Sequence, residues 1–233
     1  MTTCVVMQPT YLPWSGYFNL MAAADVFVLL DDVQFNRNSW QSRNRILSQG
    51  AELMLSVPVR AEHLDTRIQD VRLAPGPWRR KHMTSIREAY GRAPHGPDLI
   101  ELLRPAYESA CAPELLTDWN QQLISMLAEA LDIYTPLVRA STLGCEGTRS
   151  AHVLNICTKL SCNEYLSPRG SAEYLAEDGF ERNTSIALRF QAYSPAPYAQ
   201  RKTSAFVSHL SVVDVIAHQG LEFARRYIRS SLT

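Results

Sequence analysis

The sequence contains no apolar run close to the roughly 20 residues that a membrane-spanning helix needs. The apolar residues 1–7 are few, lack a basic flank and lead into Gln8-Pro9, so we expect no signal peptide. Acidic and basic residues number 23 each, so no surplus of positive charge indicates DNA as a partner. These absences predict a cytoplasmic protein that has neither membrane nor DNA as a partner.

Metal-binding and disulfide patterns are also missing. The five cysteines include no Cys-x-x-Cys pair, and Cys157 and Cys162 lie five positions apart. We therefore interpret the thiols as reduced and buried. The six histidines show neither His-x-His nor His-x-x-x-His spacing, so we expect no metal, and nothing in the sequence indicates another cofactor.

Apolar periodicity predicts an α/β protein. Residues 4–7 and 26–30 are short apolar runs, and residues 14–24 between them have helical spacing, which together predict a parallel βαβ unit. Further strands are expected at residues 53–59, 67–73, 136–140, 163–167 and 185–190. Further helices are expected at residues 78–90, 98–107, 115–131, 152–160 and 211–219, the last ended by Gly220.

The order of these elements predicts a doubly wound, mainly parallel sheet flanked by helices, with a helix-rich C-terminal half. We divide the chain into an N-terminal α/β part, residues 1–95, and a helical and mixed α/β part, residues 96–233. The two parts are expected to pack as one compact unit.

Polar and aromatic side chains gather after the first two strands. In parallel sheets, ligands bind at the carboxyl ends of the strands, so side chains that follow neighbouring strands should share one rim. The side chains expected at this rim or just after it are Gln8, Tyr11, Trp14, Asp31, Asp32, Gln34, Trp40, Arg43 and Asn44.

These residue types indicate a substrate pocket. Asp31 or Asp32 would hold an amine or act as a base, and Arg43 would pair with a carboxylate or phosphate through its guanidinium fork. Trp14 or Trp40 would form a flat apolar wall for a ring. The alternative is that the two aspartates end a strand and cap the next turn, while the arginine is a surface charge.

His82 is the other candidate base, because imidazole exchanges protons near neutral pH. It shares a helix face with Trp78, four positions earlier. The alternative is a histidine packed at a boundary between helix and sheet.

A nucleophile is harder to find, since the sequence lacks both a Gly-x-Ser-x-Gly elbow and a Gly-x-x-x-x-Gly-Lys phosphate loop. Cys4 and His82 would form a thiolate–imidazole pair if they met, but a cysteine inside an apolar strand is usually inert. Ser167 lies at the end of a predicted strand, where it would shape a site.

The segment 8–18, QPTYLPWSGYF, resembles the WbqC-like protein family. The resemblance continues through Leu30–Phe35 and Arg43–Ile46 and extends over nearly the whole chain. Later matching positions are Trp78, Lys81, His82, Tyr165, Leu166, Ser167, Tyr198, Gln200, Leu210, Ser211 and Asp214. Two positions depart from the family pattern: Met7 stands where histidine is usual before Gln-Pro, and Ser42 stands where asparagine is usual before Arg-Asn.

The resemblance implies an acyltransferase of polysaccharide or natural-product biosynthesis. A glycyl or other aminoacyl group would pass from an acyl carrier protein or an aminoacyl-tRNA to the amine of an amino sugar or similar small molecule. Asp31, Asp32 and His82 would bind and deprotonate the amine. An oxyanion would be stabilised by Gln8, Arg43 or Asn44.

Three other functions remain open. The first is a non-catalytic module that binds a sugar nucleotide or a carrier protein. The second is a thiol hydrolase built on Cys4 and His82. The third is an adenylate-forming ligase, which is implied by a weaker resemblance of the βαβ region to pantothenate-synthetase-like ligases. The sequence does not indicate an oligomeric state.

Overall fold

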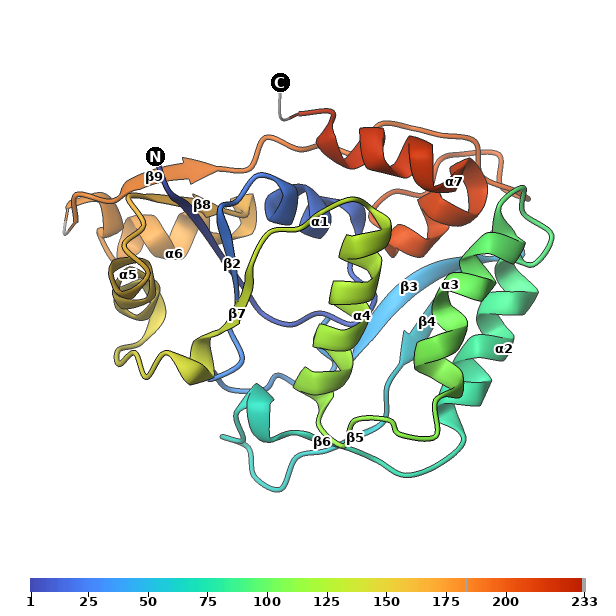
Figure 1. Cartoon of the computed structure of the whole chain (residues 1–233), viewed down its shortest axis with the longest axis horizontal. Helices are drawn as coiled ribbons and strands as arrows, with labels where there is room; N and C mark the ends of the chain where they lie inside the picture. Colours follow the sequence, from blue (N-terminus) through green and yellow to red (C-terminus); the bar gives the residue numbers. More distant parts are fainter. Residues whose placement is uncertain (183, 232–233) are drawn as a thin grey trace.

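The computed structural model describes residues 1–182 and 184–231, and its main sheet is a five-stranded parallel sheet that lies between helices (Figure 1). Its strands are β1 (Thr3–Met7), β2 (Val26–Leu29), β7 (Leu137–Arg139), β8 (Glu164–Ser167) and β9 (Ala187–Phe190). They pair in the order β7-β2-β1-β8-β9, with every neighbouring pair parallel. The predicted α/β class and the predicted βαβ unit are confirmed. The strand order reverses between β1 and β8, and ligands of doubly wound sheets bind at such a switch point.

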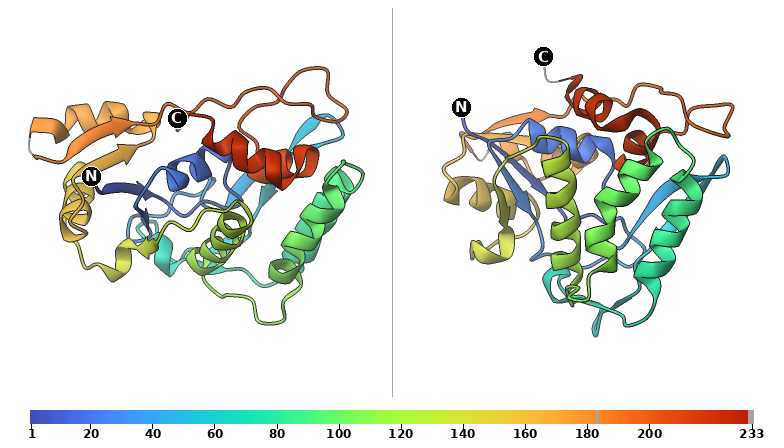
Figure 2. Two further views of the ribbon diagram at one scale, coloured as in Figure 1. Left: turned by 45° about the horizontal axis from the view of Figure 1, so that its top comes forward. Right: turned by 45° about the vertical axis from the view of Figure 1, so that its right-hand side comes forward.

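Helices flank the sheet on both sides (Figures 1 and 2). They are α1 (Ser15–Ala22), α2 (Trp78–Tyr90), α3 (Gly96–Glu108), α4 (Leu116–Ala130), α5 (Arg149–Lys159), α6 (Ala172–Glu177) and α7 (Val212–Arg229). Helices α5 and α6 cover one face, and α1, α4 and α7 belong to the other side, with α2 and α3 farther out. Six of these helices were predicted. The short α6 was not, because six residues carry little periodic signal.

Two apolar clusters share the sheet. Along β1, Cys4 and Val6 face the cluster beneath α5 and α6, whereas Val5 faces the larger cluster beneath α1 and α4. Side chains alternate along a strand, so each residue of β1 serves one face only. The same alternation sends Met7 and Gln8 to opposite sides at the strand's end.

The segment between residues 43 and 73 departs from expectation. Arg43–Ser48 forms β3, which was not predicted, and pairs antiparallel with β4 (Ala51–Ser56) in a separate hairpin. The predicted strand 53–59 is therefore displaced, and Pro58 separates β4 from the two-residue β5 (Val59–Arg60). The predicted strand 67–73 is wrong except for β6 (Arg72–Leu73), because Ile68–Asp70 is a 3-10 turn. β3 was missed because polar residues stand at the alternate positions where apolar residues predict a strand. Its inward-facing Asn44 is buried, although an amide side chain looks like a surface residue in the sequence.

Helix α7 is broken at Gly220, as its sequence predicts, but the chain resumes a helix up to Arg229. Gly220 has a φ of 81°, and a Cβ there would lie 2.9 Å from the His95 ring. Glycine is needed for both reasons. The predicted end at Gln219 therefore marks the first half of a kinked helix.

All five cysteines are free thiols. Cys4 is buried beside Cys157 and Cys162, and hydrogen bonding to Cys157, then burial, raises the pKa of Cys4. The expectation that every thiol is buried is wrong for the exposed Cys111 and the partly exposed Cys145. Within residues 1–182 and 184–231, no helix is both long and apolar enough to cross a bilayer.

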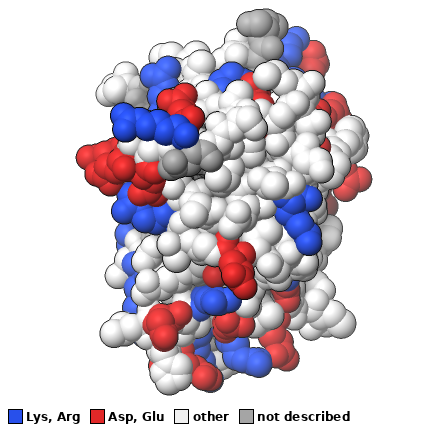
Figure 3. Space-filling model, turned by 90° about the vertical axis from the view of Figure 1, so that its left-hand side faces the viewer, with Lys and Arg blue, Asp and Glu red and all other residues white. Residues whose placement is uncertain are grey.

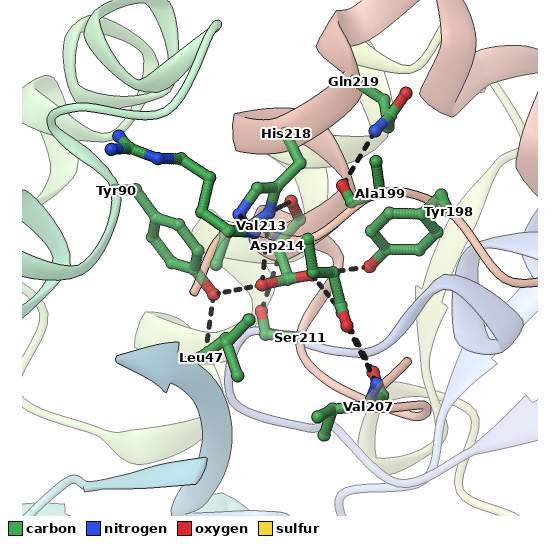
Figure 4. Close-up of polar contacts among 12 residues, drawn as sticks. Leu47, Tyr90, Tyr198, Ala199, Val207, Ser211, Val213, Asp214, His218 and Gln219 are labelled. Carbon is green, nitrogen blue, oxygen red and sulfur yellow. Dashed lines mark hydrogen bonds and ion pairs between the residues drawn. The ribbon is translucent and has the colours of Figure 1, made fainter. Parts of the chain in front are cut away.

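A fully buried carboxylate joins the C-terminal segment to the rest of the fold (Figure 4). The Oδ1 of Asp214 accepts a hydrogen bond of 2.8 Å from the Tyr90 hydroxyl of α2. Its Oδ2 accepts bonds of 2.7 Å from the Tyr198 hydroxyl and 2.8 Å from the Gln200 amide. The Tyr90 hydroxyl in turn accepts the amide N–H of Leu47 in β3. The Asp214 carboxylate of α7 thus joins α2, β3 and residues 198–200 to its own helix.

Replacing this carboxylate should destabilise the protein strongly. In Asp214→Ala, buried donors on Tyr90, Tyr198 and Gln200 lose their acceptor, and we expect the free energy of unfolding in urea to fall by at least about 3 kcal/mol. Glu114→Ala removes a carboxylate whose side chain is 82% exposed and should cost less than about 1 kcal/mol. Equal effects of the two substitutions would contradict the structural role of Asp214.

Candidate functional site

Buried amides hold the connection between β1 and α1. Asn44 Nδ2 donates hydrogen bonds to the carbonyl oxygens of Tyr11 and Leu12, at 3.0 and 2.8 Å. Asn120 Nδ2, from α4, donates to the carbonyl oxygens of Pro9 and Gln41, at 3.1 and 2.8 Å. Leu12 has a φ of 41°, which is costly for a branched side chain and persists only where neighbours fix it. The connection is therefore held in one shape.

A cavity of about 1050 Å³ opens at the carboxyl edge of the sheet, on the side of α5. Its polar lining includes Gln8, Asp32, Gln34, Arg67, Cys145 and His152. The cavity thus brings together three of the predicted rim residues, Gln8, Asp32 and Gln34.

Asp32 and His152 form a close pair in the cavity wall. His152 Nε2 lies 3.1 Å from each carboxylate oxygen of Asp32, and its Nδ1 lies 3.3 Å from the carbonyl oxygen of Glu146. Both ring nitrogens face acceptors, an arrangement that suits the doubly protonated imidazolium. The hydrogen bond that His152 donates to the Asp32 carboxylate is the largest cause that raises the pKa of His152, and burial opposes it.

Asp31 plays a different part from its neighbour. It is fully buried, and it accepts hydrogen bonds from the Ser141 amide at 3.0 Å and the Ser141 hydroxyl at 2.9 Å. Burial raises the pKa of Asp31, although these bonds oppose the shift. Asp31 therefore joins the ends of β2 and β7 and does not line the cavity.

Gln8 offers hydrogen-bond donors to the cavity. Its Oε1 accepts a bond of 2.9 Å from Gln41 Nε2, and Gln41 Oε1 accepts the amide N–H of Asn36 at 3.0 Å. The Gln8 NH₂ group makes no hydrogen bond to the described residues. Gln34 instead donates to the carbonyl oxygen of Leu64.

A second cavity, of about 290 Å³, lies across the β1–α1 connection from the first. Its lining is mostly aromatic and apolar and comprises Met7, Thr10, Trp14, Tyr17, Trp40, Asn44, Arg45 and His209. We call it the aromatic cavity. It brings together the predicted residues Trp14, Trp40 and Asn44, and it contains Met7 from the end of β1.

The walls of the aromatic cavity are fixed by packing. The Trp14 ring lies over Gly16, where an added Cβ would come within 2.1 Å of the indole. His209 packs on Trp14 with ring centroids 4.8 Å apart. Trp40 is 49% exposed and carries the Arg45 guanidinium 5.4 Å above its ring. An exposed tryptophan at the mouth of a rigid aromatic cavity is typical of a ligand subsite.

His82 and Tyr11 lie in the apolar core and line neither cavity. The Tyr11 hydroxyl is 2.8 Å from His82 Nδ1 and 2.5 Å from the Tyr107 hydroxyl. Burial lowers the pKa of His82 to about 4, so its ring is neutral at pH 7. Cys4 faces the cluster beneath α5 and α6, so the structure does not bring it to His82, and the thiolate–imidazole pair does not form.

Arg43 and Ser167 also lie outside both cavities. Arg43 is on β3, and its buried Nε has no hydrogen-bond partner among the described residues. Ser167 is fully buried, and its hydroxyl lies 3.4 Å from the Tyr165 hydroxyl.

Sequence reasoning missed His152, Arg67 and Cys145. His152 was expected only as the first residue of a helix, and it lies 120 positions from Asp32. No local spacing reports such a contact. The Gly144–Thr148 loop before α5 was the one available signal, because loops that follow parallel strands carry binding residues.

The surface over α5 and α6 carries charges of both signs (Figure 3). Arg149 pairs with Glu177 and Asp178, and Arg189 pairs with Glu164. No patch of one sign dominates this face. Among the described residues, no group of three or more His, Cys, Asp or Glu side chains is placed to hold a metal ion.

Comparison with known proteins shows the family of the chain. It is 26% identical to the uncharacterized protein Rv1507c of Mycobacterium tuberculosis over 232 residues, which cover 98% of each chain. No solved structure matches it significantly. The model of the WbqC-like protein family matches residues 8–226, which include every lining residue of the two cavities except Met7. The chain belongs to the WbqC-like protein family.

Proposed function

We propose that the protein is an acyltransferase that moves an activated aminoacyl group, such as glycyl, from a carrier protein or tRNA to the amine of a small acceptor. The observation that carries this proposal is the Asp32–His152 pair in the wall of the larger cavity. An amine acceptor needs a carboxylate to bind its ammonium and a route for its proton, and this pair supplies both.

In the proposed reaction, the bound ammonium first releases one proton to the solvent, and the neutral amine nitrogen then attacks the acyl carbon. A C–N bond forms, and the bond from the acyl carbon to the oxygen or sulfur of the carrier breaks. Asp32 takes the proton lost by the nitrogen, and the His152 imidazolium gives a proton to the leaving oxygen or sulfur. Transfer of the proton from Asp32 to His152 across their 3.1 Å contact then restores the pair.

Gln8 would stabilise the oxyanion in this reaction. Its NH₂ group is free of other hydrogen bonds among the described residues, while its Oε1 is fixed by Gln41. A donor held in place before the reaction lowers the barrier because it needs no reorganisation. Direct attack by the acceptor requires no nucleophile from the protein.

The aromatic cavity would bind a ring of one substrate. Its volume of about 290 Å³ is near the lower limit of ligand pockets, which suits one part of a larger molecule. Ligands cross the sheet edge at the switch point of doubly wound folds, and the two cavities flank the end of β1 there.

A non-catalytic binding module is the second candidate. The observation that favours it is that both ring nitrogens of His152 already have partners, so catalysis requires at least one to be released. Turnover separates the two functions. The protein would be incubated with glycyl thioester on a carrier protein, with glycyl-tRNA and with glycyl adenylate, each with a panel of amino sugars. Amide product detected by mass spectrometry supports transfer, and its absence with all donors contradicts it.

Asp32→Asn should reduce turnover by roughly 10²- to 10⁴-fold, because the amide keeps the shape of the side chain but cannot accept the proton. The rate of amide formation is the measurement. Asp31→Asn is the matched control, since Asp31 does not line the cavity, and folded Asp31→Asn protein should retain most of its turnover. A greater loss for Asp31→Asn would contradict the assignment.

The pKa values of His82 and His152 should be shifted in opposite directions. By NMR, His82 should titrate at about pH 4, and His152 should titrate above its ordinary value of 6.5. In Asp32→Asn the His152 pKa should fall, because the asparagine amide lacks the negative charge with which Asp32 stabilises the imidazolium. Turnover that depends on the imidazolium should persist below the raised pKa and decline as the pH rises through it. An unchanged His152 pKa in Asp32→Asn would contradict the pairing.

Trp40→Ala should raise the KM of the ring-bearing substrate about tenfold with little change in kcat, because ring stacking is lost away from the reacting atoms. Trp40→Phe should restore much of the affinity. Tyr134→Ala, at an aromatic residue 76% exposed and outside both cavities, is the control and should leave KM unchanged.

A further inference from the structure

A third cavity, of about 360 Å³, lies between the tip of the β3–β4 hairpin, the end of α2 and the loop before α7. It shares no lining residue with the other two cavities. Four cationic side chains line it, from Arg87, Arg92, Arg201 and Lys202, against the single carboxylate of Glu88. We call it the basic cavity.

The positive charge of the basic cavity is only partly neutralised by the protein. Arg87 pairs with Glu108 at 2.5 Å, and Lys202 Nζ bonds to the side-chain oxygen of the neutral Gln49. Within the described residues, the guanidinium groups of Arg92 and Arg201 make no hydrogen bond or ion pair. Like charges gathered in one hollow repel each other, and this chain has no net charge that would force such a cluster.

The segment that carries Arg201 and Lys202 is held firmly (Figure 4). Tyr198 and Gln200 bond to the buried Asp214. The amide N–H of Arg201 donates to His218 Nε2 at 3.1 Å, and His218 Nδ1 lies 2.9 Å from the Asp214 carbonyl oxygen. The backbone between these cations and the core is therefore ordered before any ligand arrives.

The hairpin tip closes against the same segment. Gly50 has a φ of 82°, and a Cβ there would lie 2.0 Å from the carbonyl oxygen of Lys202. Only glycine allows this approach, which brings Gln49 to the Lys202 ammonium. The cavity thus has a fixed wall on the hairpin side.

We propose that the basic cavity is a binding site for a diphosphate group, either free or part of a nucleotide. Guanidinium groups fit phosphate oxygens in a bidentate manner, and two unpaired guanidiniums beside a lysine suit an anion with several negative charges. This proposal does not depend on the proposed acyl transfer, because the residues involved are separate from Asp32 and His152.

The test is calorimetric titration of the full-length protein with sodium pyrophosphate at pH 7.5, in 50 and 200 mM NaCl. We expect one site whose affinity falls as salt rises. The double variant Arg92→Gln/Arg201→Gln should weaken binding by at least about tenfold, because two charge-assisted hydrogen bonds are lost. Both side chains are exposed, so the variant should fold, which its thermal midpoint without ligand checks.

The control is Arg104→Gln/Arg226→Gln, which changes the net charge equally at two exposed arginines outside the cavity. It should retain pyrophosphate binding, as should Asp32→Asn. Absence of binding to the wild-type protein, an equal loss in the control, or equal affinity for succinate would overturn the proposal. A comparison with ADP identifies the source, since tighter binding than pyrophosphate indicates a nucleotide and weaker binding a free diphosphate.

Discussion

The β1–α1 connection depends on the requirement that buried backbone carbonyl groups have hydrogen-bond partners. Two buried amides, Asn44 and Asn120, supply those partners for Pro9, Tyr11 and Leu12. They come from β3 and α4, so a hairpin and a helix outside the main sheet fix the chain at the sheet's carboxyl edge. Both cavities beside β1 take their shape from this one constraint.

Three aspartates show how the environment decides what a carboxylate does. Asp214 and Asp31 are both fully buried, and both oxygens of each carboxylate accept hydrogen bonds from other segments, so they join chain segments. Asp32, the neighbour of Asp31, reaches the cavity and meets His152. Two consecutive carboxylates after β2 therefore have different surroundings, one buried between strand ends and one in the cavity wall.

The positions on which the resemblance to the family was based serve the fold as much as the site. Tyr198, Gln200 and Asp214 form the hydrogen-bond network that anchors the C-terminal segment, and His82 belongs to a buried cluster. A family motif therefore includes residues that stabilise the fold, and it does not by itself separate them from residues that bind a ligand. Their burial and partners do separate them.

The sequence by itself determined the α/β class, the βαβ unit, the bounds of α2 and the grouping of Gln8, Asp32 and Gln34, because apolar periodicity and strand ends are local properties. It did not reveal β3, whose inward amide looks like a surface residue. Only the tertiary structure decided that Asp31 joins two strand ends, that His82 is buried in the core, and that His152 contacts Asp32. Those outcomes depend on contacts between residues as many as 120 positions apart, which no local pattern records.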